Sequence, residues 1–147
     1  MIRQANLDDV AELLPLFDAY RVFHKQASDL EGARAFLKER FISKEANVFI
    51  ACISATAQAV GFVLLYQGYS NLSMKPIIIL NDLFVLSEYR GQGVGQLLIQ
   101  EAKSYAREKR ASKLSLFTIK ENVTAKRLYE YLGFVCEQGF DMYELIL

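Results

Sequence analysis

The sequence predicts an α+β domain built on a mixed sheet, and three observations lead to this class. Strand-like runs and helix-like periods alternate along the 147 residues, with no linker, repeat or low-complexity segment between them. The hydrophobic share of the composition is 52%, enough for a chain of this length to bury a core. The longest apolar run, residues 77–85, has the composition of a central strand. We therefore expect a single domain that spans residues 1–147.

The chain begins with the pattern of a short strand followed by two helices. Residues 2–5 form the strand, and Asn6 can cap a helix that runs to about Tyr20 with two aspartates in its first turn. Either Ser28 or Asp29 caps the second helix. Four apolar residues then follow helical spacing: Ala33, Phe36, Leu37 and Phe41.

Two β-rich segments and the central strand come next. Residues 48–54 and 60–66 are strand-like, and the turn formed by residues 55–59 between them predicts a hairpin. Residues 68–75 are loop-like, and Pro76 marks the entry to the central strand.

The last third of the chain is expected to return to helix and to close with short strands. One helix carries an amphipathic stripe that should pack on the sheet: Val94, Leu97, Leu98, Ala102, Tyr105 and Ala106. Residues 113–119 alternate loosely as a strand, and Asn122 caps a further helix that stops at Gly133. Residues 134–137 and 142–146 are predicted as closing strands.

Composition argues against several classes of protein. Lys+Arg and Asp+Glu balance at 17 each, so no long-range attraction to nucleic acid or to an anionic membrane is expected. Cys52 and Cys136 are too few and too far apart for a disulfide framework or a zinc site, and we expect two reduced, buried thiols. Without a signal-peptide pattern or a membrane-length apolar run, a cytoplasmic location is expected.

A glycine-rich turn between the central strand and the next helix is the strongest functional signal. It consists of Arg90, Gly91, Gln92, Gly93, Val94 and Gly95. A backbone bare of side chains at a helix N-terminus lets consecutive N–H groups approach an anion, which indicates a phosphorylated ligand. A P-loop would need Lys and then Ser or Thr after Gly95. A dinucleotide fingerprint would need a small residue in place of Gln96 and an acidic residue about twenty positions later. Both alternatives fail.

The remaining pattern, Arg-x-x-Gly-x-Gly, resembles the acetyl-CoA-binding motif of the GNAT acetyltransferases. A second block, Asn122 to Phe134, is similar to the family's later motif, Asn-x-x-Ala-x-x-Leu-Tyr-x-x-x-Gly-Phe. The two blocks occur in family order, and the resemblance covers most of the chain. It implies a GNAT-like central sheet, mixed and mostly antiparallel, flanked by helices on both faces.

The resemblance also implies acetyl-CoA as co-substrate and no metal. The pyrophosphate would lie on the N–H groups of the turn beside Arg90, and the pantetheine amides would pair with the strand backbone at Phe84 and Val85. The residues expected to bind acetyl-CoA are Phe84, Val85, Arg90, Gly91, Gln92, Gly93, Val94, Gly95, Asn122 and Lys126.

Two catalytic residues follow from the resemblance. Tyr129 would protonate the departing thiolate, although packing is its alternative role. Asp82 is the best candidate for the general base, with a buried structural aspartate as the alternative, because Asn81 replaces an acid that polyamine-type relatives often carry. The backbone N–H of Phe84 or Val85 would hold the oxyanion. Strand alternation places Asn81 and Asp82 on opposite faces, and a bulge near Phe84 could reset that parity.

The acceptor is expected to be a small-molecule amine, such as a polyamine, an amino acid derivative or a thialysine-like compound. The first two helices and the hairpin loops should form its pocket, with Tyr20, Phe23, His24, Asp29 and Glu31 as contributors. The alternatives are a protein N-terminus or lysine as acceptor, a catalytically silent acyl-CoA-binding or regulatory domain, and a purely structural or interaction domain. A homodimer is an expectation from similar domains, in which C-terminal strands often pair.

Overall fold

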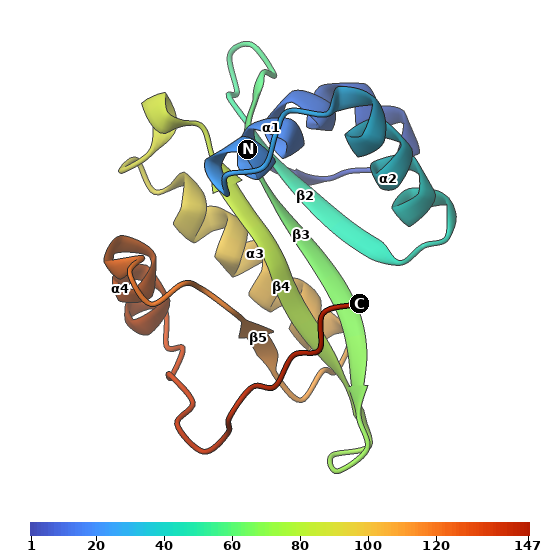
Figure 1. Ribbon diagram of the computed structural model, residues 1–147. Helices are drawn as coiled ribbons and strands as arrows, with labels where there is room; N and C mark the ends of the chain where they lie inside the picture. Colours follow the sequence, from blue (N-terminus) through green and yellow to red (C-terminus); the bar gives the residue numbers. More distant parts are fainter. The chain divides into compact units, whose positions relative to one another are not determined.

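The computed structural model describes residues 1–147, which form two compact units, Met1–Phe117 and Thr118–Leu147. The one-domain organisation stays a prediction. The first unit carries a five-stranded sheet in the order β1-β2-β3-β4-β5 (Figure 1). The strands are β1 (Ile2–Gln4), β2 (Ala46–Cys52), β3 (Ala59–Ser70), β4 (Lys75–Val85) and β5 (Leu114–Leu116). The helices are η1 (Leu7–Asp9), α1 (Val10–Phe23), α2 (Leu30–Ile42), η2 (Ser87–Tyr89), α3 (Val94–Glu108) and, in the second unit, α4 (Val123–Tyr131).

The sheet is mixed and mostly antiparallel, as predicted. Strands β1 to β4 pair antiparallel in sequence order, and β5 pairs parallel with β4 over Ile78↔Leu114 to Leu80↔Leu116. Because a parallel pair needs a crossover connection, α3 supplies it between β4 and β5. No helix of the chain combines the length and the apolar character that crossing a membrane requires.

Helices cover both faces of the sheet, which confirms the layers that the resemblance implied (Figure 1). In β2, Val48 and Ile50 belong to the buried cluster formed with α1 and α2. Phe49, between them, points to the opposite face and meets Tyr105 of α3 with ring centroids 5.8 Å apart. The β2 residues are therefore buried on both faces.

The predicted helix caps are confirmed, and of the two candidates for the second helix, Ser28 and Asp29, the structure selects Asp29. Asn6 forms a capping box at the start of η1 and α1, and Asp29 caps α2 by accepting from the Gly32 N–H at 2.9 Å. Ser28 instead donates to Asp18 at 2.6 Å and so joins α1 to the α1–α2 connection.

Several predicted boundaries and burials are wrong. Strand β3 continues to Ser70, because residues 68–70 pair with the start of β4 instead of forming a loop. Strand β5 has only three residues. On α3, Leu97 was predicted to be part of the buried stripe but is exposed, whereas Ile99, which was not predicted, is buried.

The two predicted closing strands, 134–137 and 142–146, are absent, and so residues 132–147 form no regular element. Their alternating apolar residues have the side chains of strands, but a strand also needs a partner for its N–H and C=O groups, and this segment pairs with none. Cys136 in this segment is exposed, which contradicts the prediction of two buried thiols, whereas Cys52 is buried; both are free.

Candidate active site

A bulge in β4 lies next to the predicted base. Leu64 of β3 pairs with Asp82 and Leu65 with Leu80, so Asn81 is the extra residue without a partner. The bulge resets the alternation of side chains, as the sequence suggested, but at Asn81 instead of near Phe84. Asp82 consequently shares the face of Leu64, which packs with α1 and α2, whereas Leu80 shares the opposite face with Leu65.

Asp82 is a buried carboxylate with few compensating contacts. Its side chain is part of a residue that is only 6% exposed. Burial raises the pKa of Asp82 above its usual range, while hydrogen bonds from Tyr20 and Asn81 and the nearby His24 offset part of the rise. The Asn81 amide donates to Asp82 at 3.0 Å. A carboxylate whose pKa is raised by burial holds a proton more readily and is suited to accept one.

Asp82 forms part of the wall of a cavity of about 390 Å³ between the sheet and helices α1 and α2. The side chains that line it are Phe17, Tyr20, Arg21, Asp29, Gly32, Ala33, Phe36, Tyr66, Asn81 and Asp82. Aromatic rings beside a carboxylate suit a cationic amine. The cavity lies beside the first two helices, where the acceptor pocket was predicted, but strands β3 and β4 complete its lining instead of the hairpin loops.

The predicted pocket residues are only partly in that cavity. Tyr20 and Asp29 line it, but Phe23, His24 and Glu31 do not. His24 instead contacts the Tyr20 ring at a centroid distance of 4.6 Å. Sequence reasoning missed Arg21, because an isolated arginine on a helix is ordinarily a solvated one.

The glycine turn leaves a row of backbone N–H groups without acceptors. Gly91 and Gly93 have φ angles of 73° and 84°, and a Cβ at either position would meet nothing within 4 Å. These glycines are therefore required by conformation and not by space. The N–H groups from Gly91 to Gln96 have no protein acceptor, and Gly93 begins α3 without a side-chain cap, whereas Asp29 and Asn122 cap α2 and α4. This arrangement fits the seat of an anion.

Arg90 and Gln92 fix the turn to neighbouring backbone. Arg90 donates from Nε to the Val85 carbonyl at 2.8 Å, and its guanidinium lies over the Phe23 and Phe84 rings at 5.2 and 5.5 Å. Gln92 donates to the Glu88 carbonyl at 2.9 Å. Arg90 thus attaches the turn to the end of β4, and Gln92 attaches it to η2.

The end of β4 has a free edge. Pairing with β5 stops at Leu80, so no strand pairs with this edge after the bulge. Leu86 donates to Val60 of β3 at 2.9 Å, and by two-residue alternation Phe84 also bonds to β3, while Val85 directs its N–H and C=O away from β3. Gly61 lets β3 come close here, since a Cβ on it would lie 2.7 Å from the Phe84 carbonyl oxygen.

The remaining predicted residues lie on α4 in the second unit. Asn122 accepts from the Ala125 N–H at 3.3 Å and caps the helix, as predicted. Gly133, with φ 94°, ends it in a Schellman motif in which Phe134 donates to the Tyr129 carbonyl at 3.0 Å. The Phe134 and Tyr129 rings pack at 5.8 Å, and burial raises the pKa of Tyr129.

The second block of the sequence is therefore a physical unit. Its asparagine, glycine and phenylalanine begin and end α4 and fix the Tyr129 ring. Lys126 lies one turn before Tyr129 on the same helix. Asp82, Val85 and the glycine turn belong to the first unit, and Asn122, Lys126 and Tyr129 belong to the second.

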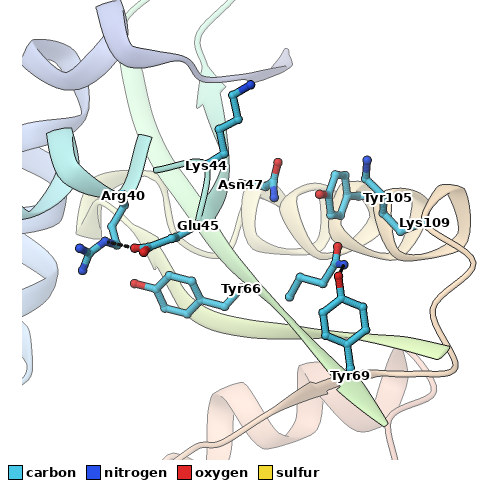
Figure 2. A pocket seen from close by; sticks show the side chains of 9 residues that line it. Arg40, Lys44, Glu45, Asn47, Tyr66, Tyr69, Tyr105 and Lys109 are labelled. Atoms are coloured by element: carbon cyan, nitrogen blue, oxygen red, sulfur yellow. Dashed lines mark hydrogen bonds and ion pairs between the residues drawn. The ribbon is translucent and has the colours of Figure 1, made fainter. Parts of the chain in front are cut away.

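A larger cleft of about 700 Å³ lies at another part of the first unit. Figure 2 shows its side chains, among them Arg40 paired with Glu45, and Lys109 beside Tyr105. It contains neither Asp82 nor any residue of the glycine turn, and it shares Tyr66 with the smaller cavity, which does contain Asp82. No three His, Cys, Asp or Glu side chains of the chain are grouped so that they could hold a metal ion.

Comparison with known proteins identifies relatives along nearly the whole chain. Residues 12–134 match the acetyltransferase (GNAT) family. An uncharacterized N-acetyltransferase of Bacillus subtilis, YhfO, is 45% identical over 142 residues, which cover 97% of this chain and 94% of that protein. Thialysine N-epsilon-acetyltransferases of cattle and mouse are 29% and 26% identical, over 90% of this chain and 82% of each relative.

A solved structure supports the same grouping. The crystal structure of a probable acetyltransferase is 38% identical, with a TM-score of 0.95, and the match covers 100% of this chain and 97% of that one.

Proposed function

The chain belongs to the acetyltransferase (GNAT) family and is an N-acetyltransferase, and from this premise we propose that it transfers acetyl from acetyl-CoA to the primary amine of a small molecule. The observation that carries the proposal is the position of Asp82. This buried carboxylate of raised pKa faces an aromatic cavity. On the same strand, Val85 lies three residues further, about 10 Å away at 3.3 Å per residue, and presents a free N–H.

The glycine turn fits the pyrophosphate of acetyl-CoA. The N–H groups from Gly91 to Gln96 and the positive end of α3 favour an anion there. At the free β4 edge the Val85 carbonyl can accept a pantetheine amide as an added strand would pair, beside the Arg90 Nε that already donates to it at 2.8 Å, and the Val85 N–H is left for the acyl oxygen. Acetyl-CoA, when bound, supplies the activated acyl group as a thioester.

The residues of the cavity would prepare the amine. An alkylammonium has a pKa of about 10.4 and must lose a proton before its nitrogen can attack. Asp82 would accept that proton, directly or through water, while Tyr20 and Asn81 orient its carboxyl group. The rings of Phe17 and Tyr66 would hold the cation before it is deprotonated.

The transfer itself forms one bond and breaks one bond. The amine nitrogen bonds to the acyl carbon, the carbon–sulfur bond breaks, and the sulfur needs a proton. The Val85 N–H would stabilise the developing charge on the carbonyl oxygen. Tyr129, by its position in the second block, would donate the proton to the sulfur. No covalent enzyme intermediate is needed.

Two relatives support a small-molecule acceptor. Their names specify thialysine, a small amino acid with a terminal amine. The cavity of about 390 Å³ is flanked by two helices and lined by aromatic rings, and its size suits a small cation better than an extended peptide.

The test is the release of CoA with a panel of amines, measured for the wild type and for Tyr129→Phe. The panel contains spermidine, lysine, thialysine and a peptide with a free N-terminus. We expect turnover of a small amine and a loss of about a hundredfold in kcat for Tyr129→Phe. Tyr131→Phe is the matched control, because Tyr131 is 77% exposed on the same helix.

Three results would contradict parts of this proposal. Full activity of Tyr129→Phe would remove Tyr129 from the mechanism. Binding of acetyl-CoA without turnover of any amine would favour a silent acyl-CoA-binding domain. Turnover of the peptide alone would favour a protein acetyltransferase.

A further inference from the structure

The cavity at Asp82 also holds a pair of opposite charges, Arg21 and Asp29. Asp82 lines the cavity from the sheet. Arg21 lies on α1, and Asp29 is the N-cap residue of α2. We propose that Arg21 and Asp29 recognise the head group of an α-amino acid, whose terminal side-chain amine is the acetyl acceptor. The inference rests on the proposed function and narrows its substrate class.

The α1–α2 connection holds both charged residues at the same cavity. Arg21 donates from Nη1 to the Ala27 carbonyl at 3.1 Å. The Asp29 N–H donates to Asp18 at 3.0 Å, and the neighbouring Ser28 hydroxyl donates to the other oxygen of Asp18. These bonds attach both ends of the short segment that separates Arg21 from Asp29 to α1, so the pair has a defined position.

Both residues keep binding capacity that the protein does not use. Arg21 has five N–H donors, of which one donates to the Ala27 carbonyl. No carboxylate lies within ion-pair distance of Arg21. Asp29 accepts once, from the Gly32 N–H at 2.9 Å, and pairs with no cation. Hydrogen bonds from Ser28 and Asp29 and, to a smaller extent, the Arg21 charge lower the pKa of the buried Asp18, and both its oxygens already accept bonds. The half-buried Arg21 can therefore receive a carboxylate from outside the protein.

The charges of the cavity match a dibasic amino acid. Asp82 takes the terminal ammonium, Arg21 the carboxylate and Asp29 the α-ammonium, so each charge of the ligand meets its opposite. A polyamine would satisfy the two aspartates but would bring a cation to Arg21. A simple monoamine would leave Arg21 and Asp29 without partners. The methylene chain between the head group and the terminal amine would pack on the rings of Phe17, Phe36 and Tyr66.

Three matched acceptors test the assignment by CoA release. Lysine carries both head groups, cadaverine is lysine without the carboxylate, and 6-aminohexanoate is lysine without the α-amine. The wild type should use lysine with a kcat/KM about tenfold above that of either analogue. The kcat/KM of Arg21→Gln should fall about tenfold with lysine and 6-aminohexanoate but not with cadaverine. Asp29→Asn retains the helix cap. Its kcat/KM should fall with lysine and cadaverine but not with 6-aminohexanoate.

The losses should appear in KM with kcat nearly unchanged, because the head group does not react. Arg34→Gln is the control variant, since Arg34 is an arginine of α2 that does not line the cavity. Equal use of lysine and cadaverine by the wild type, or equal losses with all three acceptors in Arg21→Gln, would overturn this inference while leaving amine acetylation intact. Absence of turnover with every amine would instead refute the proposed function, and this inference with it.

Discussion

Asp82→Asn should separate the catalytic role of Asp82 from a structural one. Asn has the same shape and keeps an acceptor oxygen for the bonds from Tyr20 and Asn81, so the fold should be preserved. Loss of a general base costs typically 10² to 10⁴ in rate, so we expect kcat for CoA release to fall at least about a hundredfold. In the wild type, kcat should also fall at acidic pH as Asp82 becomes protonated.

The same substitution should raise stability at neutral pH. Because burial raises the folded-state pKa of Asp82, the folded protein binds its proton more tightly than the unfolded chain does. The stability that this proton contributes is full below the unfolded value of 3.8 and is lost as pH rises through the raised folded pKa. As pH rises between the two pKa values, the unfolding free energy of the wild type should fall relative to that of Asp82→Asn by about 1.4 kcal/mol for each pH unit.

The assays are CoA release and urea unfolding, each measured from pH 4 to pH 8 for both proteins. An Asp82→Asn enzyme that turns over within about twofold of the wild type would refute the role of Asp82 as base. A stability difference that does not depend on pH would refute its raised pKa.

Three further substitutions test single features of the structure. Gly93→Ala forces a side chain into a left-handed residue with open space around it, so it should cost about 1 kcal/mol of stability and weaken acetyl-CoA binding by calorimetry, while Gly93→Asn should be milder; equal behaviour of the two would contradict the conformational argument. Gly61→Ala should place its Cβ against the Phe84 carbonyl and lower both stability and kcat/KM, and unchanged kinetics would show that the β4 edge tolerates a shift. Asn122→Ala should lower the unfolding free energy by about 1 kcal/mol through loss of the cap to Ala125, and no change in the melt would argue against the cap.

Local chemistry made much of the fold predictable. Asn6, Asp29 and Asn122 begin helices because their side chains satisfy N–H groups that the helix cannot, and this depends only on neighbouring residues. The failures concern long-range pairing. Strand β3 reaches Ser70 because β4 lies opposite, and residues 134–146 have strand-like side chains but no partner.

The candidate site divides in the same way. The glycine turn could be predicted because Gly91 and Gly93 supply the left-handed residues that its backbone requires, and the bulge was anticipated, although not its position at Asn81. Arg21 and Tyr66 could not be predicted as cavity residues, because α1, α2 and β3 bring them together only in the folded chain. The close approach at Gly61 was weakly indicated by the sequence, because a glycine inside a β-rich run typically marks a close backbone approach.

The central claim is that the bare turn after β4 seats acetyl-CoA, and amide NMR tests it most directly. In a titration of the ¹⁵N-labelled chain with acetyl-CoA, the amide resonances from Gly91 to Gln96 should show the largest shifts, because their N–H groups have no acceptor in the protein. The Gly68 amide, in the β3–β4 hairpin, serves as an internal reference. Binding that leaves the turn resonances unmoved and shifts those of another surface would contradict the account.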